Sequence, residues 1–323
     1  MKKLVFLFLL LVGFACAESN APPPANEIKE IDLPPAQGVS LIVLGTVQDA
    51  GSPHIACKRS CCKTLFDAPD PLRKVVSLGV VDKPSKISLL FEATPDITTQ
   101  TKVLGNYASL GKQLPDGIFL THAHIGHYSG LMYLGKEATN AQKVPVYAMP
   151  GMRKFLENNG PWSQLVTNEN IEIAPMVNHQ SVQLSPSLKV IPLQVPHRDE
   201  YSETVGFKII GPNKSALFIP DIDKWSKWEQ DITQILSDVD YAFLDATFYD
   251  GDELNTRDIS EIPHPFVVES MERFGALDSE EKKKVHFIHF NHTNALLRDD
   301  SPAYKKVLEN GFQVARIHEV FQL

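Results

Sequence analysis

The sequence lacks several features that would assign it to a common class of protein. It has no long run of basic residues and a formal net charge of −8, so we do not expect a nucleic-acid-binding surface. It shows no internal repeat, and beyond its N-terminus no apolar stretch is long enough to cross a membrane. What remains is a chain of 323 residues, 43% hydrophobic and 22% charged, which is typical of one large globular domain or two small ones.

The N-terminus has the pattern of an export signal. Two lysines precede an apolar stretch that is too short for a lasting transmembrane helix. Residues 1–17 then read as a signal peptide, or residues 1–15 as a lipoprotein signal followed by a lipid-bearing Cys16 that anchors the protein to a membrane. A polar, proline-rich tether is expected over 18–38 and a folded domain over 39–323. These features predict an exported protein of the cell envelope or periplasm, and an outer-membrane lipoprotein if Cys16 is lipidated.

The rest of the chain alternates apolar strands with helical segments, which predicts an α/β fold. The expected strands are rich in Val, Ile, Leu and Phe, and they cover residues 39–47, 86–96, 116–124, 144–150, 188–197, 204–211, 215–223, 240–248 and 284–292. The expected helices cover residues 151–160, 227–239, 265–275 and 302–311.

Histidines and an aspartate gather where these strands end. The stretch "THAHIGHYSG" places His122 and His124 on one side of an extended segment, and His127 falls in the first turn of the next helix. Three histidines at such a junction predict a metal site. Three further candidates end strands of their own, namely His197, Asp221 and His289.

These residues resemble the metallo-β-lactamase superfamily, whose H-x-H-x-D-H motif is matched by His122, His124 and His127. The segments "LGTVQDAGSPHIACKRSCC", "FEATPDITTQ" and "VPHRDEYSETVGF" are similar to the branch of pyrroloquinoline quinone biosynthesis protein B and to the cyclic phosphodiesterase of phosphonate breakdown. The resemblance covers about residues 39–323. It implies a four-layer αββα sandwich with metals at one edge, between the two sheets.

The resemblance also implies two ligand sets. One metal would be held by His122, His124 and His197, the other by His127 and His289, with Asp221 bridging the two. Zinc suits an imidazole-rich set with open positions. Iron or manganese are the alternatives at the active site, since two histidines and a carboxylate also form the facial set of non-heme iron enzymes.

Gly126 stands where the motif has its aspartate. The second set should therefore be one carboxylate short and bind its ion more weakly, and Gly126→Asp should restore the ligand. The competing explanation is that Gly126 makes room for a substrate group or for a water that completes the metal's shell.

Three functions remain open. A hydrolase would use a metal-activated water on a small-molecule phosphodiester or related ester. An iron oxygenase or quinone-cofactor biosynthesis protein would need only the second set, and the presence of the first set favours the hydrolase. A non-catalytic metal-binding protein of the same fold is the third function, and the loss of the aspartate at Gly126 favours it.

Two residues are expected to act beside the metals. The resemblance to phosphodiesterases of the superfamily implies that His264 donates a proton to the leaving group, as a catalytic residue together with Asp221. A histidine that merely opens a helix beside two prolines is the structural alternative. Asp245 is expected to orient a metal-bound histidine.

The cysteines form a second group. The resemblance implies a structural zinc held by Cys57, Cys62 and His292, with Cys61 or His54 as the fourth ligand. The spacing departs from the family's C-x-C-x-x-C pattern because Arg59 stands in place of the middle cysteine. A disulfide between two of the cysteines is the alternative in an exported protein.

Overall fold

The computed structural model describes residues 36–254 and 262–323. The predicted signal peptide, Cys16 and nearly all of the predicted tether lie outside the described residues, so the predictions of export and lipid anchoring stay predictions. Within the described residues, no helix combines the length and the apolar character that crossing a bilayer requires.

Two seven-stranded sheets form the centre of the fold, in the orders β14-β1-β2-β3-β4-β5-β6 and β13-β12-β11-β10-β9-β8-β7. In the first sheet β3 to β6 are parallel and the other pairs antiparallel. In the second sheet β10 to β13 are parallel and the other pairs antiparallel. The first sheet contains β1 (Val39–Gly45), β2 (Ser77–Asp82), β3 (Ile87–Phe91), β4 (Gly117–Phe119), β5 (Val144–Ala148), β6 (Ile171–Pro175) and β14 (Val320–Gln322). The second contains β7 (Val182–Ser185), β8 (Leu188–Gln194), β9 (Val205–Ile210), β10 (Ser215–Ile219), β11 (Tyr241–Asp245), β12 (Val285–Ile288) and β13 (Gln313–Val314).

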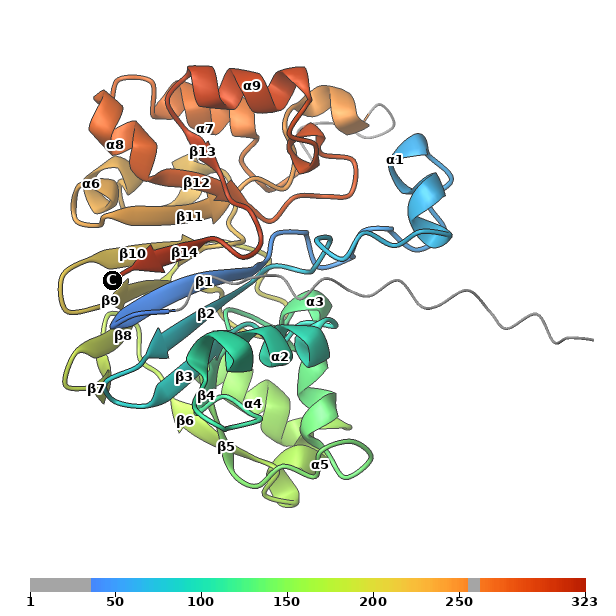
Figure 1. Cartoon of the computed structure of the whole chain (residues 1–323), viewed down its shortest axis with the longest axis vertical. Coiled ribbons are helices and arrows are strands. Elements are labelled where there is room, and N and C mark those ends of the chain that lie inside the picture. The colour runs from blue at the N-terminus through green and yellow to red at the C-terminus, as the bar shows by residue number, and fades with distance from the viewer. Residues whose placement is uncertain (1–35, 255–261) are drawn as a thin grey trace, which may run out of the picture. The chain divides into compact units, whose positions relative to one another are not determined.

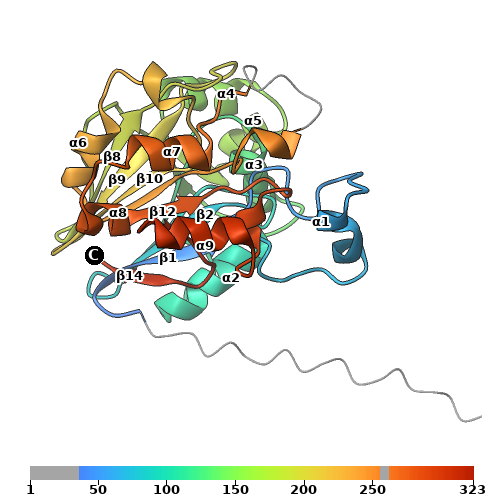
Figure 2. The same cartoon turned by 90° about the horizontal axis from the view of Figure 1, so that it is seen from above.

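Helices lie on the outer sides of both sheets (Figures 1 and 2). The α-helices are α1 (Ser60–Lys63), α2 (Ile97–Ala108), α3 (Ile125–Tyr128), α4 (Pro150–Asn158), α5 (Trp162–Thr167), α6 (Ile232–Ser237), α7 (Val267–Arg273), α8 (Ser279–Lys284) and α9 (Pro302–Glu309). Short 3-10 helices are η1 (Thr64–Phe66), η2 (Ser129–Leu134), η3 (Trp225–Lys227), η4 (Gly251–Leu254) and η6 (Ala295–Leu297).

The apolar strands bury both of their faces, as two-sided sheets require. One core fills the space between the sheets, where Phe119 of β4 meets Phe207 of β9 edge to face with ring centroids 5.6 Å apart. A second core lies between the second sheet and its helices and includes Leu244 of β11, Val267 of α7 and Val307 of α9. Helices α2, α4 and α5 cover the first sheet (Figure 1). The predicted αββα sandwich is confirmed.

Strand direction places the functional residues. Strands β1, β3 and β4 run the same way within the first sheet, and β8, β10, β11 and β12 run the same way within the second. The carboxyl ends of each group therefore lie at one edge of their sheet, where loops can present polar side chains without disturbing the apolar core.

Candidate metal centre

One half of the centre comes from the chain that follows β4. The Nε2 atom of His122 lies 2.7 Å from the Nδ1 atom of His124. His197, which follows β8, joins them, because one ligand atom from each histidine and a carboxylate oxygen of Asp221 all lie within 4.8 Å of one another. The structure thus brings together the first predicted ligand set.

The other half contains His127 and His289. His127 lies in α3, and His289 directly follows β12 with a left-handed backbone, φ 68°. Such strain in a non-glycine residue is typical of functional sites. The ligand atoms of both histidines lie within 4.8 Å of each other and of a carboxylate oxygen of Asp49.

Asp221 lies between the two halves and is 4% exposed. Its Oδ1 atom is 3.3 Å from His197 Nε2, and its Oδ2 atom is 3.4 Å from His122 Nε2. The Oδ2 atom also lies 3.7 Å from His127 Nε2 and 4.0 Å from His289 Nε2. A single carboxylate is therefore shared by both sets, as the resemblance implied.

The outer nitrogen of each histidine faces a further polar side chain. Such partners fix the ring orientation and tautomer of metal-binding histidines. The pairs are His122 with Thr121 at 2.8 Å, His124 with Glu200 at 3.2 Å, His197 with Asp223 at 3.2 Å, His127 with Glu92 at 3.5 Å and His289 with Thr247 at 2.8 Å. Sequence reasoning missed these partners. The one signal that could have found Glu92 is its position directly after an apolar strand.

In the part of the chain that the structure describes, several buried atoms of the centre have no hydrogen-bond partner. They include both ring nitrogens of His127, the Nε2 atoms of His197 and His289, the Oδ1 atom of Asp221, and both carboxylate oxygens of Glu92 beside His127. Buried polar atoms are normally satisfied, and leaving them unpaired is costly. The three Nε2 atoms lie around Asp221 in the interior of the cluster, so the residues fit a metal as their missing partner. Imidazole and carboxylate are the ligands that zinc uses at catalytic sites.

Burial and neighbouring charges shift the pKa values of the centre in opposite directions. Burial alone would raise the pKa of Asp221, but its electrostatic interactions with the neighbouring imidazoles of His197, His264 and His289 lower it well below its ordinary value. Burial lowers the pKa of His122 well below its ordinary value, and the charge of His127 lowers it further. At neutral pH Asp221 is therefore ionised and His122 is neutral.

His264 lies against the centre, although it comes from the segment that precedes α7. Its Nδ1 atom is 2.9 Å from Asp245 Oδ2 and 3.1 Å from Asp221 Oδ1. Burial alone would lower the pKa of His264, but these two carboxylates raise it well above its ordinary value. Asp245 accepts a hydrogen bond from the Thr247 hydroxyl at 2.7 Å, and that hydroxyl lies 2.8 Å from His289 Nδ1. Asp245 thus contacts His264 directly and reaches His289 through Thr247.

The second half was expected to be one carboxylate short, but the structure brings a further carboxylate, that of Asp49, beside His127 and His289. Asp49 belongs to the loop after β1 and not to the histidine motif, yet its carboxylate lies beside the two histidines that the motif's aspartate would accompany. A side chain at residue 126 has no space, because a Cβ atom there would lie 1.7 Å from the Cβ atom of Asp49. The expectation that Gly126→Asp would restore a ligand without disturbance is therefore also wrong. Gly126 does make room, but the room is filled by another part of the chain.

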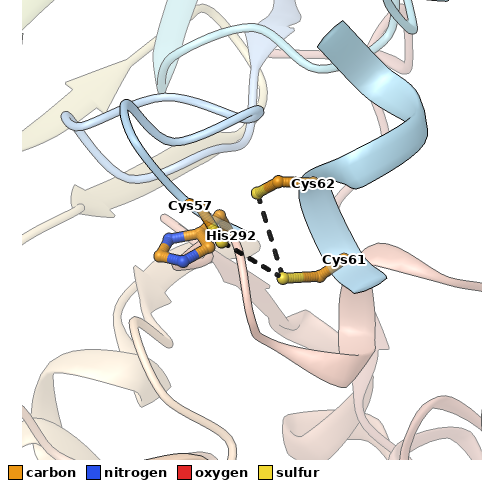
Figure 3. A group of neighbouring side chains, drawn as sticks. All are labelled: Cys57, Cys61, Cys62 and His292. Carbon is orange, nitrogen blue, oxygen red and sulfur yellow. Dashed lines mark hydrogen bonds between the residues drawn. The ribbon is translucent and has the colours of Figure 1, made fainter. Parts of the chain in front are cut away.

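The cysteine cluster is assembled from α1, the segment before it and the loop after β12. Cys57, Cys61, Cys62 and His292 each offer a ligand atom within 4.8 Å of the others (Figure 3). The sulfur atoms are 4.0 Å apart for Cys57 and Cys61 and 3.9 Å apart for Cys61 and Cys62, so the three cysteines are free. His54 is not in the group and lies beside His292, with ring centroids 4.5 Å apart. Three thiols and an imidazole suit tetrahedral zinc.

Known proteins with related sequences span nearly the whole described fold. The "Coenzyme PQQ synthesis protein B" of Methylorubrum extorquens strain PA1 is 22% identical over 303 residues, covering 85% of this chain and 97% of that protein. The protein of the same name from Methylobacillus flagellatus is 24% identical over 308 residues, covering 84% and 96%. The relationship is distant but extends along almost the full length of both relatives.

Two solved structures share the fold. Zinc-bound PqqB from Methylobacterium extorquens superposes with a TM-score of 0.72 at 21% identity, covering 88% of this chain and 100% of that chain. A diphosphatase from the PhnP family superposes with a TM-score of 0.58 at 23% identity, covering 88% and 96%. Both belong to the branches that the sequence resembles. A model of the "Beta-lactamase superfamily domain" matches residues 88–290, which is more than half of the chain, and the chain therefore belongs to the beta-lactamase superfamily.

Proposed function

We propose that this protein is a metal-dependent hydrolase that cleaves a small-molecule phosphodiester or related ester, with zinc at the His/Asp centre. The observation that supports this most is the convergence of two complete sets of ligand atoms on Asp221. A site with both halves has the arrangement that two-metal hydrolysis uses. A non-catalytic binding protein would have no need for a second half or for His264 beside it.

The chain's own residues have distinct parts in the proposed reaction. Bound zinc would lower the pKa of its water and polarise a substrate oxygen. Asp221 holds the two halves in register, and Thr121, Glu200 and Asp223 fix the histidine rings. The bond from phosphorus to the water oxygen forms while the bond to the leaving oxygen breaks.

In the proposed reaction, His264 protonates that leaving oxygen. Its Nδ1 atom is held by Asp245 and Asp221, which leaves Nε2 as the ring nitrogen that can donate a proton. Transfer of that proton releases an alcohol instead of an alkoxide, which is the usual contribution of a general acid.

An iron-dependent oxygenase or quinone-cofactor function is the second candidate. His127, His289 and Asp221 make a two-histidine, one-carboxylate set, and the relatives named "Coenzyme PQQ synthesis protein B" favour it. The complete first half argues for the hydrolase, because a single iron at the second half has no use for His122, His124 and His197.

The test is a comparison of zinc-loaded and iron-loaded protein. Zinc-loaded protein should hydrolyse bis(p-nitrophenyl) phosphate, and His197→Ala should lower kcat/KM by at least about a hundredfold, since even the partners of metal ligands are worth ten- to a hundredfold. His179→Ala is the matched control, because His179 is exposed and belongs to none of the candidate metal-binding groups of the described residues. Turnover that requires iron and dioxygen, with no hydrolysis by the zinc form, would reject the hydrolase.

A further inference from the structure

The loop after β1 is held against the loop after β12. Val47 forms a β-bridge with Phe290, and the backbone N–H of Gln48 donates to the Phe290 carbonyl at 2.8 Å. Asp49 is the next residue along one loop, and His289 directly precedes Phe290 on the other. Backbone pairing, and not side-chain flexibility, therefore brings Asp49 to the second half of the centre.

The helix that carries His127 approaches the same loop from another side. Gly126 packs so closely on Asp49 that a Cβ atom at residue 126 would lie 1.7 Å from the Asp49 Cβ and 2.3 Å from its Cα. Real Cβ atoms do not approach so closely, so only glycine allows this contact. Gly126, which stands in place of the motif's aspartate, thus leaves the space that Asp49 occupies.

The two histidines beside Asp49 carry buried nitrogens that need a partner. His127 and His289 are each 0% exposed, and within residues 36–254 and 262–323 their Nε2 atoms have no hydrogen-bond partner. A carboxylate oxygen of Asp49 lies within 4.8 Å of the ligand atoms of both. Two buried imidazole nitrogens with a carboxylate beside them, and Asp221 opposite, give the number and type of ligands that a divalent metal takes.

We propose that Asp49 is the carboxylate ligand of the second metal and that it replaces, from a different loop, the aspartate missing at position 126. The inference rests on the metal binding that the proposed function requires. The exchange keeps the charge and ligand number of the second half while moving the carboxylate about 77 residues away in the sequence.

The experiment measures zinc binding to the full chain by competition with a chromophoric chelator and by isothermal titration. Wild-type protein should bind two ions at the centre, apart from any ion at the cysteine cluster. Asp49→Ala should weaken the second ion at least about tenfold and leave the first unchanged, since even indirect partners of a metal are worth that much. Asp67→Ala is the matched control, because Asp67 is an exposed carboxylate on the same N-terminal segment.

Asp49→Asn keeps the size of the side chain and guards against loss of fold. It should weaken the second ion as Asp49→Ala does, while the thermal midpoint of the metal-free protein stays near that of wild type. Equal second-ion affinity in wild type and both variants would overturn the assignment, as would binding of only one ion by the wild-type centre. Two tightly bound ions without phosphodiester hydrolysis would instead reject the proposed reaction and leave the role of Asp49 intact.

Discussion

The cysteine cluster and the His/Asp centre are built in different ways. Three ligands of the cysteine cluster lie within residues 57–62, and two of them, Cys57 and Cys61, are only partly buried. The His/Asp centre draws its residues from the ends of separate strands in both sheets, and His127 and His289 are fully buried. The first takes three ligands from one short segment and only His292 from a distant loop, whereas the second takes nearly every ligand from a different strand end.

The two clusters are nevertheless carried by the same pair of loops. The loop after β1 leads from Asp49 to Cys57, and the loop after β12 carries His289 and then His292. A metal in the cysteine cluster would therefore fasten together the two loops that supply the second half of the centre. The first half comes from other loops, so a metal in the cysteine cluster should not affect it. Substitutions that weaken ion binding in one half and not in the other test this difference between the halves.

The largest effect is expected from the residue that both halves share. Asp221→Ala should lower kcat/KM for bis(p-nitrophenyl) phosphate by about a thousandfold and should remove both ions from the centre, because Asp221 faces histidines of both halves, namely His122 and His197 in the first and His127 and His289 in the second. Asp223→Asn alters the partner of His197, whose carboxylate also pairs with Lys227, and should lower kcat/KM by about ten- to a hundredfold. Metal analysis should still find the ion of the cysteine cluster in Asp221→Ala. Loss of that ion as well would show that the clusters are not separate.

The next effect concerns His264, which contacts the centre without belonging to either half. His264→Gln should slow the cleavage of a diester with an alkyl leaving group by about a hundredfold, the low end of general-acid contributions. The same substitution should change the cleavage rate little when the leaving group is p-nitrophenolate, because that group leaves without protonation. Steady-state rates over a series of leaving groups measure the difference, with His179→Gln as the control. An equal decrease in rate for every leaving group would mean that His264 has a structural role and is not the general acid.

A smaller effect is expected from the cysteine cluster. Cys62 is fully buried, and Cys62→Ser should release the cluster's ion, lower the thermal midpoint and weaken the second ion of the centre about tenfold through the loosened loops. The first ion should be held as before. Ser60→Ala is the control on the same helix, where residue 60 is exposed. Equal weakening of both ions, or of neither, would contradict the coupling through the loops.

Much of the fold could be predicted because its central strands are apolar on both faces. Strands such as β1 and β10 read as continuous apolar runs, and each was expected within a few residues. Strand β2 was missed although all of its residues are buried, and so were elements without that signal. Strand β13 has only two residues, and β6 and β7 are partly exposed.

Helix α2 was missed because its threonines and Gly105 are weak helix formers. Helix α6 begins later than expected because the Asp231 side chain caps it by accepting from the Thr233 N–H.

The candidate site shows the same limit at the level of single residues. His122, His124 and His127 could be identified because they are close together in a rare pattern, and His197, Asp221 and His289 because each follows a predicted strand. Asp49 also follows a strand, yet nothing in the sequence relates it to Gly126. That relation depends on the close packing of two loops that are far apart in the chain. Long-range packing of this kind has no local signal, and only the structure reveals it.

The smallest predicted effect tests the packing of Gly126 against Asp49. Gly126→Ala adds one methyl group, which would lie 1.7 Å from the Cβ and 2.3 Å from the Cα of Asp49 unless the loop after β1 moves. We expect a loss of about 1–2 kcal/mol in the free energy of unfolding, as for other overpacked sites. We also expect the affinity for the second ion to fall by less than tenfold, because a shift of the loop withdraws Asp49 from His127 and His289 while its carboxylate remains.

Gly105→Ala is the matched control: among the described residues its added methyl has no neighbour closer than 3.7 Å, and within α2 alanine should be neutral or stabilising. Denaturant unfolding and zinc competition on both variants measure the two effects. Wild-type stability and second-ion affinity in Gly126→Ala would mean that the loop makes room for the methyl group at no cost, and that the position of Asp49 does not depend on the glycine.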